Sequence, residues 1–212
     1  MSPVETWTLR IHVAAGVVAL IAGFGALVTI KGGRRHRLAG TGFLLAMSGV
    51  VATVIALLAI DPTASRGILT LVAIFSGYLA FSGFRALSRS RERNGVRAVD
   101  WVAAGGVLLA CLSLGAWGGT RMLDGRNFGI VLVAFGTIGV AFGLLDVRSF
   151  RSERGEERLV SHLQRMTGAF IATVSAVSAV TLAPALGIAA WLWPTILGVP
   201  LIAYWSRAYA TD

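Results

Sequence analysis

The chain has 212 residues, of which 56% are hydrophobic and only 14% are charged, and its mean hydropathy is +0.76. A soluble domain carries about 25% charged residues, so this composition excludes an ordinary soluble domain and favours a membrane protein. The net charge of +9 comes from basic residues in short gaps between apolar blocks, and no nucleic-acid-binding motif is present. We therefore expect no nucleic-acid partner.

Apolar blocks follow one another along the chain, and each is near the ~20 residues that a helix needs to cross ~30 Å of hydrocarbon. The blocks predict transmembrane helices at about 11–30, 40–60, 67–87, 98–119, 127–147, 165–183 and 186–206. Because the connections are short, we expect consecutive helices to be antiparallel neighbours in a single domain over 1–212. The predicted fold class is all-α, an integral membrane bundle of seven transmembrane helices.

The basic residues divide unevenly between the two ends of this bundle. Segments 31–39, 85–100, 146–165 and the tail after Ser206 hold fifteen of the nineteen Lys and Arg residues. Cytoplasmic loops are enriched in Lys and Arg, so the pattern predicts an outside N-terminus and a cytoplasmic C-terminus. In the first block the positive charge follows the apolar run, which favours a retained span over a signal peptide. The expected location is the bacterial cytoplasmic (inner) membrane, as a multi-pass protein.

The basic cytoplasmic rim is expected to attract anionic lipid headgroups, at about 1 kcal/mol per basic residue near the surface. The arginines expected to make these contacts are Arg34, Arg35, Arg37, Arg89, Arg91 and Arg93.

Glycines recur inside the apolar blocks and predict close helix packing, since small residues let helix backbones approach in lipid. Gly16 and Gly23 lie seven residues apart, and Gly129, Gly136 and Gly143 keep the same step. Packing within one chain is the favoured interpretation. A homo-oligomer, or contact with another membrane protein, is the alternative.

Signs of catalysis are scarce. No Asp, Glu, Lys or Arg lies near the centre of a predicted span, and the single lysine, Lys31, lies at a membrane boundary. Ion-coupled transporters and proton pumps generally need charged groups at membrane depth. HExxH, GxSxG and P-loop signatures are missing. An enzymatic role stays undecided, and the kind of enzyme we would consider is a membrane oxidoreductase.

Two of the chain's three histidines occur in a repeated setting, "HRLAGTG" from His36 and "HLQRMTG" from His162. Both are predicted on the cytoplasmic side. Two converging imidazoles could bind a transition metal or provide the axial ligands of a haem. Together with adjacent arginines they could instead hold the polar head of a quinone or of another small molecule. The alternative is that both are unconnected residues at the membrane interface.

The third histidine, His12, is predicted on the outer side, about one helix length from His36, and has no histidine partner there. It could ligate only a separate outer group. A four-histidine, two-haem cytochrome is therefore disfavoured.

The order His12, "GVVALIAGFGAL", "KGGRRHRLAG" and a later "H…RMTGAFIA" helix resembles a group of uncharacterised bacterial predicted membrane proteins with six or seven helices. The resemblance implies a helical membrane fold and makes His12, His36 and His162 its motif histidines. It implies no reaction.

Taken together, these features predict an integral membrane binding or accessory protein of unspecified role, with a subunit of a larger membrane complex as one form of it. The cofactor is unspecified, with a haem or a transition metal as the possibilities. A haem- or metal-binding redox protein is the alternative, and a facilitator for a small neutral solute is a further one, because such pores need no buried charge.

Overall fold

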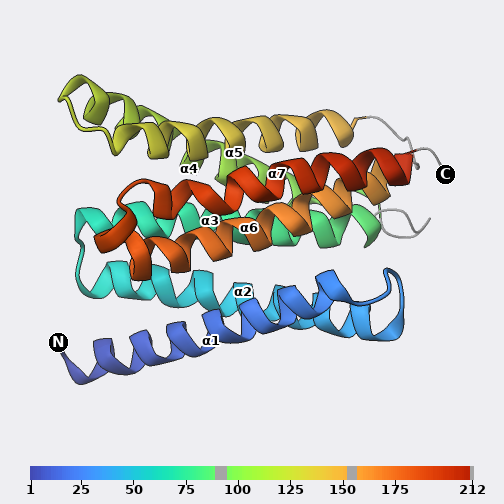
Figure 1. Cartoon of the computed structure of the whole chain (residues 1–212), viewed down its shortest axis with the longest axis horizontal. Coiled ribbons are helices and arrows are strands. Elements are labelled where there is room, and N and C mark those ends of the chain that lie inside the picture. Colours follow the sequence, from blue (N-terminus) through green and yellow to red (C-terminus); the bar gives the residue numbers. More distant parts are fainter. Residues whose placement is uncertain (89–94, 152–156, 211–212) are drawn as a thin grey trace.

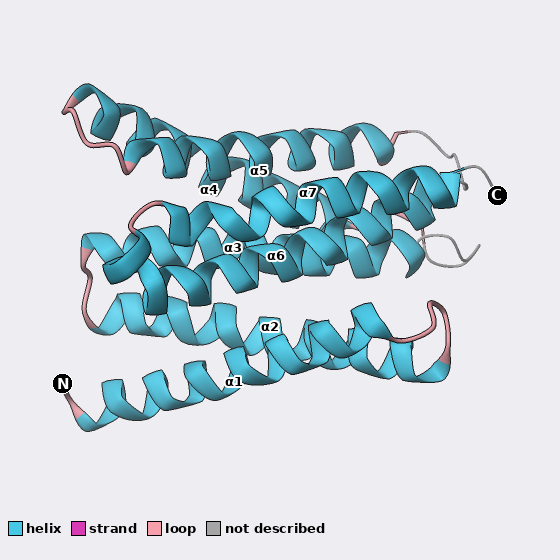
Figure 2. Cartoon of the chain, viewed as in Figure 1, coloured by secondary structure: helices cyan, strands magenta, loops and turns pink. Residues whose placement is uncertain are grey.

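The computed structural model describes residues 1–88, 95–151 and 157–210, and helices make up most of this part of the chain (Figure 2). In chain order they are α1 (Pro3–Val28), α2 (Arg34–Ile60), α3 (Ala64–Ser88), α4 (Ala98–Leu123), α5 (Gly129–Ser149), α6 (Glu157–Leu186) and α7 (Ala189–Ala210). Within the described residues, six of these helices, α1 to α6, are long and apolar enough to cross a membrane. The structure thus confirms an all-α bundle of apolar helices. The seventh span and the orientation stay predictions.

Several helices extend past the apolar runs that predicted them. At the N-terminus, the Ser2 hydroxyl accepts from the Glu5 backbone N–H at 3.1 Å, while the Glu5 carboxylate accepts from the Ser2 N–H at 3.3 Å. This capping box satisfies free N–H groups and lets the helix begin before the apolar run. At the start of α4, the Asp100 carboxylate likewise accepts from the Arg97 N–H at 2.9 Å.

The helices run roughly parallel or antiparallel to one another, with α1 and α2 at the lower edge of Figure 1 and α4 and α5 at the upper edge. Between these pairs lies α3, which contacts α2, α4, α5 and α6, and half of whose apolar window is buried. Consecutive helices are neighbours as expected, except for α5 and α6. The latter packs mainly on α3 and α7.

Glycines bring α4 and α5 into close contact, as the sequence predicted. A Cβ atom added at Gly136 would lie 2.8 Å from the Cys111 carbonyl oxygen and 2.8 Å from the Gly115 backbone. At Gly139 it would lie 2.2 Å from the Cys111 sulfur. The helix backbones therefore touch where a larger residue has no room. Gly16 on α1 differs, because nothing lies within 4 Å of the equivalent position.

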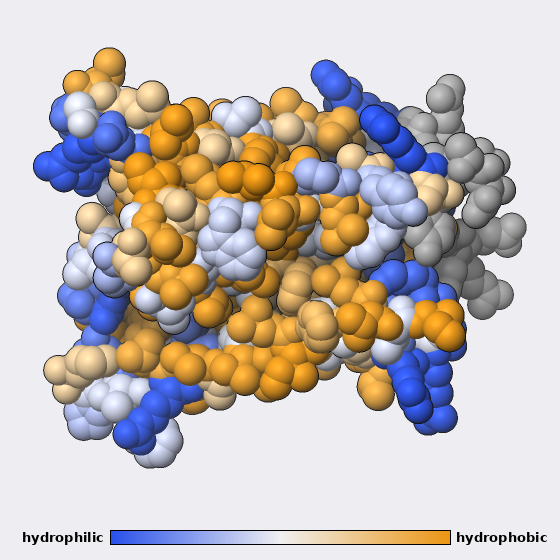
Figure 3. All heavy atoms as spheres, in the orientation of Figure 1, coloured by the Kyte–Doolittle hydropathy of each residue, from blue (hydrophilic) through white to orange (hydrophobic). Residues whose placement is uncertain are grey.

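On the face that Figure 3 shows, the surface is apolar along the middle of the bundle and hydrophilic toward its two ends. The first helix contributes strongly to this apolar surface: only 11% of its apolar window is buried, and Ile21 and Phe24 are 68% and 60% exposed. An apolar belt between two polar ends is the arrangement that a bilayer requires.

Candidate functional site

His36 and His162 come from α2 and α6, and the fold brings their rings together. The two ring centroids are 6.4 Å apart and the ring planes meet at 77°. Both side chains are partly buried. The histidines lie near the helix ends that form the predicted cytoplasmic end of the bundle. The sequence hypothesis that they converge therefore agrees with the geometry.

Each histidine is held by a backbone carbonyl. The Nδ1 atom of His36 is 3.0 Å from the carbonyl oxygen of Ala26, and Nδ1 of His162 is 2.8 Å from that of Gly83. A carbonyl can only accept, so each Nδ1 carries the hydrogen and donates. In the neutral ring, Nε2 then keeps the lone pair that a metal ion needs. Protein ligands to metals are commonly oriented in this way.

The His36 bond also stabilises the end of α1. Ala26 lies in the last turn of that helix, where carbonyls lack an intrahelical partner. The Lys31 ammonium donates to the carbonyls of Ala26 at 3.1 Å and Leu27 at 2.6 Å. Burial lowers the pKa of Lys31. His36 and Lys31 together cap α1 and fix the turn that leads into α2.

The helix position one turn after His36 is open. Nothing lies within 4 Å of a Cβ atom built at Gly40, one turn after His36. On α6, Met166 follows His162 by one turn, and its Cγ would lie 2.9 Å from a Cβ at Gly83. Glycine at position 83 therefore lets α6 lie close to α3, beside the carbonyl that accepts from His162.

Next to His162 lies a buried charged cluster that the sequence did not reveal. Arg165 on α6 and Asp146 on α5 form an ion pair, with Nη2 and Oδ1 2.7 Å apart and Nε and Oδ2 3.1 Å apart. The Tyr78 hydroxyl on α3 donates to Asp146 Oδ2 at 2.5 Å. The Arg165 guanidinium also lies 5.5 Å from the centre of the Phe142 ring.

A second buried ion pair joins α3 to α4. Arg85 donates to Asp100 through Nε at 2.8 Å and Nη2 at 2.7 Å. Asp100 and Asp146 both lie among arginines along the sequence, near the ends of α4 and α5. The partners could not be chosen from sequence, because many arginines lie close along the chain. Tyr78 gave no signal beyond its being a polar residue inside an apolar run.

His12 lies elsewhere. Its Nδ1 is 2.9 Å from the Thr53 hydroxyl on α2. Along α1 it is fourteen residues from Ala26, roughly 21 Å at 1.5 Å per residue. No group of three or more His, Cys, Asp or Glu residues that could hold a metal occurs in the part of the chain that the structure describes. A closed four-residue metal site of those types is thus not built there.

The arginines predicted to contact lipid divide into two sets. Arg34, Arg35 and Arg37 are exposed at the start of α2. Arg89, Arg91 and Arg93 lie outside the described residues.

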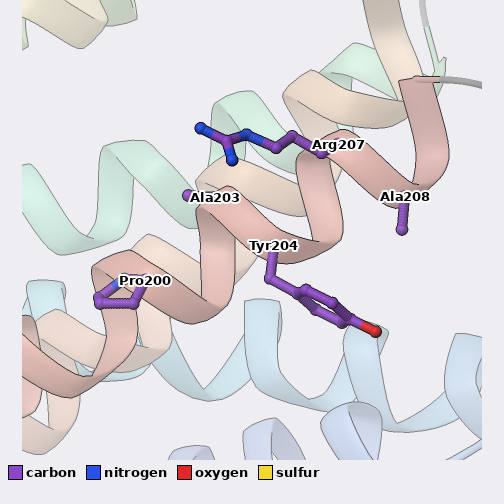
Figure 4. A pocket seen from close by; sticks show the side chains of 5 residues that line it. All are labelled: Pro200, Ala203, Tyr204, Arg207 and Ala208. Atoms are coloured by element: carbon purple, nitrogen blue, oxygen red, sulfur yellow. The ribbon is translucent and has the colours of Figure 1, made fainter.

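A surface hollow on α7 offers no cofactor site. Its lining residues all belong to α7, and Figure 4 shows the Tyr204 and Arg207 side chains extending in different directions. The lining consists of Pro200, Ala203, Tyr204, Arg207 and Ala208. A hollow formed by one face of a single helix is open to its surroundings and does not enclose a ligand.

Comparison with known proteins adds no identity: no family model matches the chain, and neither a curated protein nor a solved structure matches it. The resemblance drawn from the histidine motifs therefore stays a prediction. The function has to be argued from the site itself.

Proposed function

We propose that this protein is a binding protein of the bacterial cytoplasmic membrane, with its N-terminus outside, and that it binds a transition metal ion or the iron of a haem. The ligands are His36 and His162, at the cytoplasmic end. The observation that carries this proposal is the meeting of the two rings, each with Nδ1 bonded to a carbonyl.

The spacing suits a shared ion. Two imidazoles on opposite sides of a metal, each with a metal–nitrogen distance of about 2.0–2.1 Å, have ring centres roughly 6 Å apart. The observed separation is 6.4 Å. Imidazole nitrogen suits Zn, Cu, Fe and Ni, and a pair of histidines can hold a haem iron from both sides. Any further ligands would come from water, a porphyrin or a small molecule.

The test is a reduced-minus-oxidised absorption spectrum and a metal analysis on the same detergent-purified sample. A haem gives Soret and α bands, whereas a bare ion gives a colourless or weakly coloured protein with near-stoichiometric metal. Either signal should be lost in His36→Ala and in His162→Ala. His12→Ala is the matched control, because it removes the same side chain at the other end of the bundle and should keep the signal.

Melting temperatures of the three variants show whether each is folded. A wild-type preparation that is colourless and takes up no metal would contradict the proposal. A signal that persists in both His36→Ala and His162→Ala would also contradict it, because the ligand would then lie elsewhere.

A second candidate role is that of a subunit in a larger membrane complex. The exposed apolar face of α1 and the open position at Gly16 favour it, since a helix of another protein could pack there. Cross-linking in native membranes, followed by purification in mild detergent, tests this role. A partner captured in the wild type and lost in Gly16→Leu would support it, and capture that is unchanged would contradict it.

The alternative role, a facilitator of a small neutral solute, needs a passage lined by polar side chains, and it has less support. Ser178 accepts from Trp193 Nε1 at 2.7 Å, and Thr181 donates to the carbonyl of Val177 at 2.8 Å. Ser175 is fully buried. Ser178 and Thr181 are engaged in hydrogen bonds between or within helices, whereas the Ser175 hydroxyl is buried without a hydrogen-bond partner among the described residues.

A further inference from the structure

Four arginines lie at the end of the bundle opposite to the histidine pair, and they differ in what surrounds them. Arg10 lies over the Trp7 ring at 5.0 Å. Arg66 forms ion pairs with Glu5 and Asp61. The remaining two, Arg121 and Arg126, form no ion pair with any residue that the structure describes.

These two arginines line one cavity, where the start of α3 faces the turn between α4 and α5. Its volume is about 230 Å³, several times the ~30 Å³ that one water molecule occupies in the liquid. The other lining residues are Ala64, Ser65, Ile68, Phe128 and Leu132. The lining thus contains two arginines and no carboxylate residue.

The turn fixes the two arginines beside each other. The Gly125 N–H donates to the Met122 carbonyl at 3.0 Å, and the Arg126 N–H donates to the Arg121 carbonyl at 2.9 Å. This pair of bonds is the Schellman motif that ends many helices. Gly125 has φ +71, a left-handed conformation that suits glycine. Because the motif joins their backbones, Arg121 and Arg126 are held close before any ligand arrives.

The packing of α4 on α3 holds Arg121 near the cavity. Its guanidinium lies 5.8 Å from the centre of the Trp117 ring. That ring in turn lies 3.6 Å from a Cβ position at Gly67 on α3. On the facing side, Ser65 belongs to the first turn of α3, where backbone N–H groups give the helix end a partial positive charge.

The nearby carboxylates of the described residues form no ion pair with these two arginines. Asp61 pairs with Arg66 at 3.3 Å. Asp124 lies in the turn itself, is exposed, and does not line the cavity. A site that gathers positive charge, contains donors and has room for a small group fits an anion. Arginine binds phosphate through two parallel hydrogen bonds.

We propose that Arg121 and Arg126 form a phosphate-binding site at the end of the bundle expected to face outside. The phosphate belongs either to the headgroup of an anionic lipid or to a free phosphate ion. Ile68, Phe128 and Leu132 provide apolar surface beside the arginines, as a lipid glycerol and chain would need. This site is independent of the histidine pair.

The experiment reconstitutes the full chain in nanodiscs. In the lipid arm, the discs contain phosphatidylcholine with a minor share of phosphatidylglycerol, and native mass spectrometry counts the phosphatidylglycerol that stays bound. In the second arm, the discs contain phosphatidylcholine alone, and inorganic phosphate is titrated while the melting temperature is followed. The variants are Arg121→Gln, Arg126→Gln and, as control, Arg10→Gln.

We expect each cavity variant to weaken phosphate binding about tenfold, the factor that corresponds to about 1.4 kcal/mol, and the control to leave it unchanged. Arg126→Lys keeps the charge but not the planar fork, so its effect should be intermediate. Retained phosphatidylglycerol identifies a lipid site, and stabilisation by inorganic phosphate identifies a free-ion site.

Two results would overturn the proposal. One is no preference for phosphatidylglycerol together with no response to phosphate. The other is an equal loss in Arg10→Gln, which would show attraction to the whole charged surface. Melting temperatures of the ligand-free variants show that each is folded.

Discussion

Arg165 and Asp146 form a bidentate ion pair between α6 and α5, and both side chains are almost fully buried, at 3% and 2% exposed. The Tyr78 hydroxyl completes the contact from α3. The helices α5 and α6 pack little on one another, so a long arginine side chain bridges backbones that are not adjacent. In the same way, Asp100 on α4 pairs with Arg85 on α3. The α4–α5 hairpin thus supplies both carboxylates, and α3 and α6 supply both arginines.

Removing one member of the Arg165–Asp146 pair leaves the other as an uncompensated buried charge. We expect Arg165→Met to lower the free energy of unfolding by about 3–5 kcal/mol. The double variant Arg165→Met with Asp146→Asn should lose less than the sum of the two single variants. Thermal or denaturant unfolding in mild detergent measures this, with the exposed Arg151→Gln as the control. Equal effects at Arg151 and Arg165 would contradict it.

Tyr78→Phe removes one hydroxyl and keeps the ring. The lost hydrogen bond is to a charged carboxylate, for which the cost is about 1.5–3 kcal/mol. We expect a fall of this size in the unfolding free energy of the wild type. In the Asp146→Asn background the effect should be smaller, because the acceptor is no longer charged. A double-mutant cycle gives the coupling directly, and additive effects would show that Tyr78 acts independently of Asp146.

Gly136→Ala tests the close packing of α4 on α5. The added Cβ would lie 2.8 Å from backbone atoms of Cys111 and Gly115, which cannot move aside as a flexible side chain can. Overpacking of this kind costs about 1–3 kcal/mol. Gly105→Ala on α4 is the matched control, since nothing lies within 4 Å of its Cβ position. The expected ranking of melting temperatures is Gly105→Ala at or above wild type, with Gly136→Ala below it.

The orientation can be tested by cysteine labelling, because the natural Cys111 is buried at 1% exposure and should stay unlabelled. In intact cells, a membrane-impermeant maleimide should label Asp124→Cys. It should label Arg35→Cys only after the membrane is opened. The reverse pattern would place the N-terminus and the histidine pair on the opposite sides from those proposed here.

The helices could be predicted from sequence because the length of an apolar run is itself the property that a bilayer demands. Helix ends were less predictable. The α1 helix begins at Pro3, well before the predicted span at 11. Capping contacts such as that of Ser2 with Glu5 decide these ends. Such contacts depend on individual residues within one turn and not on the mean hydropathy of a segment.

The candidate site was only half predictable. A repeated sequence setting drew attention to His36 and His162, but their separation depends on how α2, α3 and α6 pack. Likewise, Arg126 carried no sequence signal beyond being a basic residue on the outer side. Its place beside Arg121 follows from the turn at Gly125 and from the contact of Trp117 with α3. Contacts of this kind form between different helices, so no periodic pattern in the sequence indicates them.

The two buried ion pairs also set how deep the α4–α5 hairpin lies in the bilayer. Since lipid and protein surfaces are similarly apolar, the hydrophobic effect alone does not fix how far one apolar helix lies along its neighbours. Movement by one helical turn, about 5.4 Å, would separate Asp100 from Arg85 and Asp146 from Arg165 at once. Both pairs lie at the same end of the bundle. Together they therefore fix the position of the α4–α5 hairpin along the bundle axis relative to α3 and α6.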